Sequence, residues 1–94
     1  MIQIDHIINN VDGLHARPIA ELADIAKKLG TQIFILKGEK ITNVENITEV
    51  ISFGARYGQK ITIVVNGYNE DNASELVKEY IKKICKYINN FQML

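Results

Sequence analysis

The stretch Gly13-Leu14-His15-Ala16-Arg17-Pro18 combines residue types that can handle phosphate. Residues 16–29 are good helix formers with apolar positions three and four apart, which predicts a helix and places His15 at or beside its N-cap. The first amides of a helix have no partner within it, and with the helix dipole they attract anions. Arg17 adds forked donors, and Pro18 is tolerated because a first-turn N–H would be unpaired anyway. The stretch therefore predicts a phosphate-binding site made by Ala16, Arg17 and Pro18 beside a nucleophilic imidazole, although a lone histidine before a helix is more often a solvated loop residue or a cap.

Composition limits the partners and the compartment. The chain has 94 residues, of which 47% are hydrophobic, and its 11 basic and 11 acidic side chains cancel. Bulk charge therefore does not favour binding of nucleic acid or of an anionic membrane, which leaves a local basic patch as the alternative. We find no apolar run long enough to span a bilayer and no signal peptide. Cys85 is the single cysteine and cannot form an internal disulfide, so we expect a cytoplasmic protein, and we expect neither a metal nor a cofactor.

Alternation, helical spacing and turn residues predict seven elements in one domain, 1–94. The expected order is strand 2–8, helix 16–29, a hairpin of strands 31–36 and 40–44, a short helix 47–53, strand 59–65 and a long helix that begins at 69–71. Asn46 should cap the short helix and Gly54 should close it. The fold class is α/β (α+β), an open-faced sandwich with helices on one face of a four-stranded antiparallel sheet (βαββαβα).

The strand residues divide into two faces. The face that the helices cover should receive Ile33, Ile35, Thr42, Val44, Ile61, Ile63 and Val65. The outer face then receives an apolar strip of Ile7, Phe34, Leu36, Ile41 and Val64, although the outer face of an open sandwich is normally polar. Cover by a second copy or by the tail residues Phe91, Met93 and Leu94 would explain the strip, and scattered surface hydrophobes are an equal alternative.

Two further side chains lie near the predicted site or share its chemistry. His6 falls on the apolar face of the first strand, and nothing near it in sequence would orient it for catalysis, so we expect a histidine at the edge of the core. Glu21 is four residues beyond Arg17, and an intrahelical ion pair could hold the guanidinium until phosphate competes for it.

Nearly the whole chain resembles the HPr family, the histidine-containing phosphocarriers of the bacterial sugar phosphotransferase system. The resemblance covers the stretch around His15, the spacing to the hairpin, Ser52-Phe53-Gly54, the strand Ile61-Thr62-Ile63 and the last helix, and leaves 91–94 as an extension. It implies that His15 takes a phosphoryl group on Nδ1 from phosphorylated enzyme I and passes it to a IIA component. The resemblance thus implies a carrier rather than an enzyme, with sugar transport as the process it serves.

The resemblance also implies a docking surface on the exposed part of helix 16–29 and on the short helix, at Ile47, Thr48, Ile51 and Gly54. The alternative is that Ile47 and Ile51 belong to the core. Both isoleucines share one side of the short helix while Val50 and Phe53 occupy another, and a two-turn helix on a sheet cannot bury both sides. This favours docking.

Two departures from the family pattern affect function. Asn46 stands where many members carry a serine that a kinase phosphorylates, so we expect no such switch here. Glu21 and Asp24 lie on the docking side, where members tend to be neutral or basic, and would slow encounter or select an unusual partner. These carboxylates leave open an HPr-like regulatory adaptor with weak or no phosphoryl exchange. The sequence does not support an acylphosphatase, because it lacks the glycine-rich phosphate loop of that class. It does not support an RNA-binding sheet either, because its strands lack the aromatic side chains on which bases stack.

Overall fold

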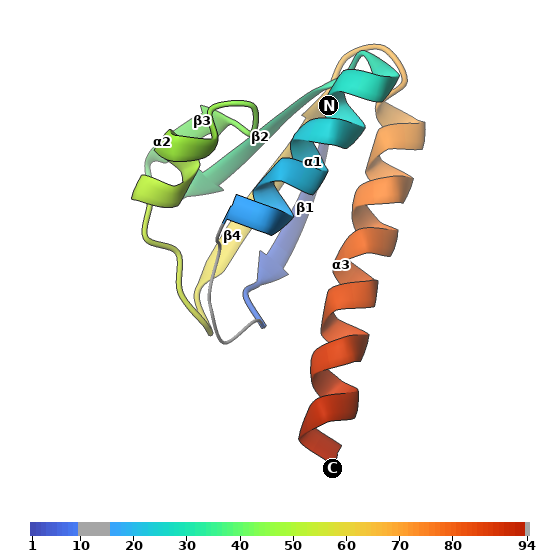
Figure 1. Cartoon of the computed structure of the whole chain (residues 1–94). Helices are drawn as coiled ribbons and strands as arrows, with labels where there is room; N and C mark the ends of the chain where they lie inside the picture. The colour runs from blue at the N-terminus through green and yellow to red at the C-terminus, as the bar shows by residue number, and fades with distance from the viewer. Residues whose placement is uncertain (10–15, 94) are drawn as a thin grey trace.

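Seven elements follow one another in the computed structural model, which describes residues 1–9 and 16–93 and the side chains among them up to residue 82. They are β1 (Ile2–Ile7), α1 (Ala16–Leu29), β2 (Gln32–Lys37), β3 (Lys40–Asn43), α2 (Ile47–Ser52), β4 (Lys60–Asn66) and α3 (Glu70–Met93) (Figure 1). The order βαββαβα is confirmed, and the observed bounds differ from the expected ones only at the element ends. No helix in these residues is long and apolar enough to cross a membrane.

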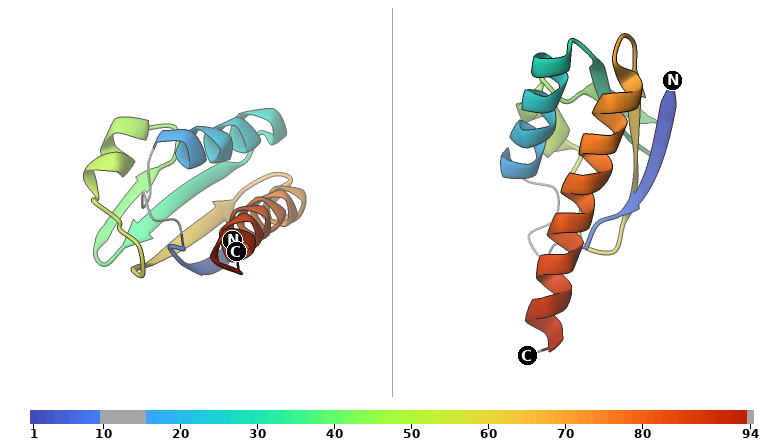
Figure 2. Two further views of the ribbon diagram at one scale, coloured as in Figure 1. Left: turned by 60° about the horizontal axis from the view of Figure 1, so that its bottom comes forward. Right: turned by 90° about the vertical axis from the view of Figure 1, so that its right-hand side faces the viewer.

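The four strands form one antiparallel sheet in the order β1-β4-β2-β3. β2 and β3 are a hairpin in which Lys37 pairs with Lys40, and Gly38 adopts the left-handed φ of +61° that this tight turn requires. All three helices lie on the same side of the sheet (Figure 2), with α1 between α2 and α3. The fold is therefore the open-faced α+β sandwich that the sequence predicts.

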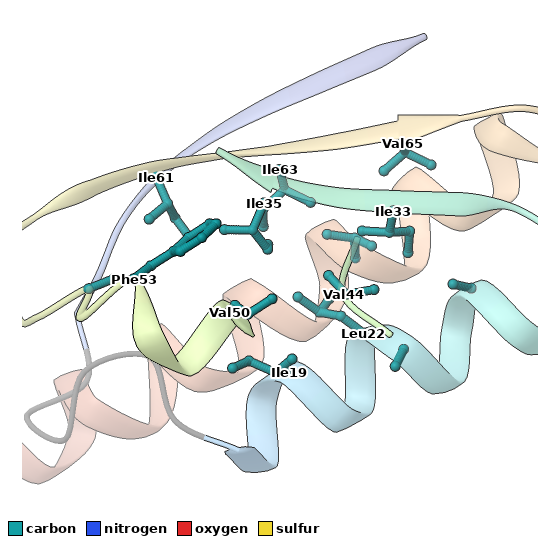
Figure 3. Close-up of a cluster of buried hydrophobic side chains, with 14 of the residues drawn as sticks. Ile19, Leu22, Ile33, Ile35, Val44, Val50, Phe53, Ile61, Ile63 and Val65 are labelled. Carbon is teal, nitrogen blue, oxygen red and sulfur yellow. The ribbon is translucent and has the colours of Figure 1, made fainter. Parts of the chain in front are cut away.

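The core lies between the sheet and the helices, and its strand residues are those expected. Each member of the predicted helix-covered face is buried: Ile33, Ile35, Thr42, Val44, Ile61, Ile63 and Val65. α1 adds Ile19 and Leu22 to this layer, and α2 adds Val50 and Phe53 (Figure 3). α3 adds buried Ala73 and Val77, with Tyr80 and Ile81 packed at the margin. The helical spacing of the sequence also predicts Ile84 and Ile88 on the inward side of α3, but both lie beyond the described side chains.

The outer face carries a smaller apolar patch than the sequence suggests. Val64 pairs with Phe34 and Leu36 pairs with Ile41, so these four residues are neighbours on β4, β2 and β3. Ile7 of β1 pairs with Lys60 of β4. The polar pair Asp5 and Thr62 lies between Ile7 and the other apolar residues of this face. The predicted strip therefore divides into a four-residue patch, which we call the outer patch (Phe34, Leu36, Ile41, Val64), and an isolated Ile7.

The C-terminal tail does not cover the outer patch. Phe91 and Met93 belong to α3, which continues past the end of the sheet on the helical side (Figures 1 and 2). A helix that runs through Met93 cannot turn back under the opposite face, so this part of the sequence-based expectation is wrong. Leu94 lies outside the described residues.

We expect Ile35→Ala to lower the free energy of unfolding by about 2–5 kcal/mol, because it opens a cavity beneath α1 and α2. Ile35 is 0% exposed, whereas Ile41, in the same hairpin, is 57% exposed. Ile41→Ala is the matched control and should cost less than about 1 kcal/mol, the span of strand propensities. Urea unfolding of both variants measures the difference, and similar losses would contradict the assigned faces.

Candidate functional site

The backbone is fixed on both sides of the segment that contains His15. On the N-terminal side, Ile8 is buried and its N–H donates to the carbonyl of Gln59 at 2.9 Å, while Gly58 N–H donates to the carbonyl of Ile8 at 2.8 Å. On the C-terminal side, α1 begins at Ala16. His15 itself, with residues 10–14, lies outside the described residues. The structure therefore fixes where the chain enters and leaves this segment.

The first turn of α1 is at the protein surface. Ala16 and Arg17 are exposed and Pro18 is half-buried, but Ile19 is completely buried in the core. The first turn contains no acidic residue that could compete with an anion for the free amides. Ala16, Arg17 and Pro18 thus lie together in the first turn of α1, at the helix start that the sequence predicts. Whether they bind phosphate stays a prediction.

Arg17 and Glu21 do not form the ion pair that the sequence suggests. Among the described residues of α1, the i,i+4 pair that does form joins Asp24 to Lys28, with 2.9 Å between Oδ2 and Nζ, and it raises the pKa of Lys28. An acid that precedes a base by four residues is the favourable orientation on a helix, and Arg17 to Glu21 is the reverse. On α3, burial raises the pKa of Tyr80, the carboxylate of Glu21 raises it further, and the charge of Arg17 opposes this shift.

α2 presents part of the predicted docking set. Val50 and Phe53 are buried, whereas Ile51 is 43% exposed and Thr48 is also exposed. Ile47 is intermediate, because it packs against the edge of the core. The sequence predicts that Ile47 and Ile51 are both exposed on one side of the helix. Ile51 is exposed as predicted, whereas Ile47 is only partly exposed. Whether these residues dock a partner stays a prediction.

Asn46 does not cap α2 with its side chain, contrary to the sequence-based expectation. Its backbone carbonyl accepts the N–H of Val50 at 3.1 Å, but its φ of −87° and ψ of 70° differ from the extended backbone typical of a side-chain cap. The preceding turn uses Asn43 instead, whose Oδ1 accepts the N–H of Glu45 at 2.9 Å. The asparagine at position 46 therefore contributes to α2 through its backbone.

Lys37 holds the C-terminal end of α2, a role that the sequence analysis missed. Its Nζ donates to the carbonyl of Phe53 at 2.9 Å and to that of Gly54 at 3.4 Å. A cation is favoured at this end of a helix, where carbonyls lack partners. Gly54 then ends the helix with a φ of +64°, which a residue with a Cβ rarely adopts. No local signal could reveal Lys37, because β2 and α2 are separated by the rest of the hairpin.

His6 is a half-buried residue on the helix-covered face of β1, opposite Ile61, and burial lowers the pKa of its imidazole. This agrees with the expected position at the edge of the core. Within the part of the chain that the structure describes, no three His, Cys, Asp or Glu side chains gather as metal ligands.

An exposed helix N-terminus with an adjacent arginine, on an open-faced α+β sandwich, is an arrangement that suits small proteins that bind an anionic group such as phosphate. Residues 2–83 match the family model described as "PTS HPr component phosphorylation site". The chain therefore belongs to the HPr family of the phosphotransferase system. As a member it is a phosphocarrier and not an enzyme.

Individual relatives agree with this assignment. The chain is 35% identical to the phosphocarrier protein HPr of Mycoplasma capricolum subsp. capricolum over 84% of its own length and 89% of the relative. A solved histidine-containing phosphocarrier protein of Mycoplasma superposes with a TM-score of 0.79 at 32% identity, covering 89% of this chain and 96% of that one. An HPr dimer from Thermoanaerobacter tengcongensis gives a TM-score of 0.65 at 29% identity, covering 90% and 98%.

We expect stability to fall between pH 7.5 and 5.5 through His6. Its folded pKa lies below the ordinary value of 6.5, so near that pH the unfolded chain binds more protons than the folded one. The stability that neutral His6 contributes is therefore fully present above the unfolded pKa, and it is lost as the pH falls below that value. Urea midpoints of wild type and His6→Gln at both pH values measure this, because all other titrating groups are shared. Equal pH dependence in the two proteins would contradict it.

Proposed function

We propose that this chain carries a phosphoryl group on His15 from phosphorylated enzyme I to IIA proteins of the phosphotransferase system. The observation that supports the proposal is the opening of α1: its first turn is exposed, free of acidic side chains and contains Arg17, and it begins at the residue after His15. Membership of the HPr family supports the same role. This exchange would place the protein in the cytoplasm.

The proposed step needs little beyond positioning and charge stabilisation. The lone pair of the His15 ring nitrogen Nδ1 forms a bond to phosphorus while the bond between phosphorus and the donor breaks. The positive end of α1 and Arg17 would stabilise the negative charge that the phosphoryl group adds. Transfer to a IIA protein reverses the step at the same nitrogen. The phosphoryl group is held at an open helix end, where an acceptor can reach it.

Incubation with enzyme I and labelled phosphoenolpyruvate should label the wild-type chain with an acid-labile, base-stable phosphoryl group. His15→Ala should carry no label, because the only proposed acceptor nitrogen is removed. Arg17→Ala is the companion variant: we expect it to be labelled about tenfold more slowly, as for loss of one stabilising charge, with unchanged thermal unfolding because Arg17 is exposed.

Two outcomes of this assay would overturn the assignment. Label that survives His15→Ala would place the acceptor elsewhere. A wild-type chain that accepts no label, or accepts it and fails to pass it to a IIA protein, would favour the HPr-like regulatory adaptor. We further propose that the kinase-dependent switch is absent, because Asn46 has no hydroxyl to phosphorylate.

A second copy of the chain is a further partner that we propose. The outer patch supports it, since Phe34 and Leu36 are only half-buried and Ile41 is exposed beside them. β3, which carries Ile41, is also a sheet edge with unpaired backbone groups. A dimer has been solved for the HPr of Thermoanaerobacter tengcongensis.

Sedimentation velocity should show a concentration-dependent dimer that Ile41→Lys abolishes, because a charge at the centre of an apolar contact must be desolvated. Ile7→Lys is the matched control, since Ile7 lies on the same face but outside the outer patch, and it should leave the dimer intact. A wild-type protein that sediments only as a monomer at concentrations of about 100 μM, a weak-interface range, would remove this proposal.

A further inference from the structure

The exposed side of α2 combines apolar and acidic side chains. We call the α2 surface the set Glu45, Ile47, Thr48, Glu49 and Ile51. Glu45, Thr48 and Glu49 are exposed, Ile51 is 43% exposed and Ile47 is intermediate. Glu45, Ile47, Thr48 and Glu49 also line one shallow open depression, together with Asn46 and Ser52. An apolar side chain beside a shallow hollow is typical of a protein docking surface.

The charge on the α2 surface has one sign. From Ile41 to Ala55 the sequence contains Glu45 and Glu49 and no lysine or arginine. Among the described residues, neither carboxylate lies within ion-pair distance of a cation, and the four ion pairs of these residues involve other acids. α1 differs, because Lys28 neutralises Asp24 there. Two lysines lie near this surface: Lys37 donates to the carbonyls at the C-terminal end of α2, and Lys40 lines a neighbouring shallow hollow with Glu49. Neither lysine forms an ion pair with Glu45 or Glu49, so both carboxylates are available to a partner.

We propose that the partner docking on the α2 surface presents an apolar socket for Ile51 with lysine or arginine side chains at its rim, facing Glu45 and Glu49. The inference rests on the proposed phosphocarrier function and adds the chemistry of the surface that the carrier recognises. An acidic partner would place like charges together around the contact, which costs affinity and slows encounter. A wholly apolar partner would desolvate two carboxylates without compensation. A basic rim is the one complement that satisfies both parts of this surface.

The experiment measures phosphoryl transfer from phosphorylated enzyme I to the chain, and from the chain to IIA proteins, with proteins of the organism that encodes it. Second-order rate constants are recorded between about 50 and 500 mM salt, where screening of exposed charges becomes nearly complete. We expect the wild-type rate with the α2-docking partner to fall with salt. The double variant Glu45→Gln/Glu49→Gln should transfer the phosphoryl group about three- to tenfold more slowly at low salt, and its rate constant should depend less on salt.

The matched control is Glu75→Gln with Glu79→Gln, which removes the same charge from exposed positions on α3, a helix that lies away from α2 (Figure 1). Its rates should stay within about twofold of wild type. Ile51→Ala tests the socket and should slow transfer while leaving the salt dependence unchanged. Thermal unfolding of each variant checks the fold, since Glu49 lies in the first turn of α2, where an acid stabilises the helix.

The results separate this inference from the proposed function. Transfer rates that rise when Glu45 and Glu49 are neutralised would contradict a basic rim on the partner. Rates that change with neither the substitution nor the salt concentration would contradict it as well. Both results leave the carrier function in place. If only the α3 control slows transfer, the partner docks elsewhere. A wild-type chain that takes no label from enzyme I overturns the carrier function, and the inference falls with it.

Discussion

Burial of one sheet face beneath α1 is the constraint on which the site depends. Ile19 and Leu22 are in contact with the strand layer and are almost fully buried (Figure 3). Ile19 lies less than one turn from the start of the helix, so α1 cannot slide or rotate without exposing it. The same anchor leaves Ala16 and Arg17 just beyond the core. Packing therefore keeps the beginning of α1 at the surface, and its position does not depend on any contact with phosphate.

α2 depends on tertiary contacts even more strongly. A helix of six residues is not stable alone, because nucleation costs more than so few hydrogen bonds return. Val50 and Phe53 hold it through the core, and Lys37 holds its last carbonyls from β2. Ile51 follows Val50 in sequence but lies about 100° further around the helix, on a side that the core does not cover. Its exposure follows from the burial of its neighbours, which is how a short amphipathic helix presents apolar surface to a partner.

Most of the fold could be predicted from the sequence, because hydrophobic periodicity records which side of each element is buried. The strand assignments illustrate this: Ile33 and Ile35 face the helices and Phe34 does not, as simple alternation requires. Gly30 and Gly54 similarly mark the ends of α1 and α2 through their left-handed backbone. For the candidate site, the position of Ala16, Arg17 and Pro18 followed from recognising a helix start.

Two of the failures share a cause, which is the effect of tertiary contacts that a local sequence pattern does not contain. Asn46 is a good N-cap residue, but the turn that precedes it is closed by Asn43 and gives Asn46 a different backbone. Arg17 and Glu21 have the right spacing for an ion pair, yet their order on the helix is unfavourable. Lys37 caps a helix that is remote in sequence. For Asn46 and Lys37 the deciding partner or geometry is set by the fold and cannot be read from the residue itself, whereas the unfavourable order of Arg17 and Glu21 is already present in the sequence.

Charge placement matters more in this chain than total charge. With a net charge of zero, the protein has no overall field that draws a partner from a distance. Orientation during encounter must then come from local patches within about one Debye length, roughly 8 Å at physiological salt. Arg17 gives the helix opening positive character, while Glu45 and Glu49 make the α2 surface negative. A partner with an anionic phosphoryl group and a basic rim meets both patches only in one orientation, so segregated charges on a neutral chain can align the two reacting groups before the apolar contact forms.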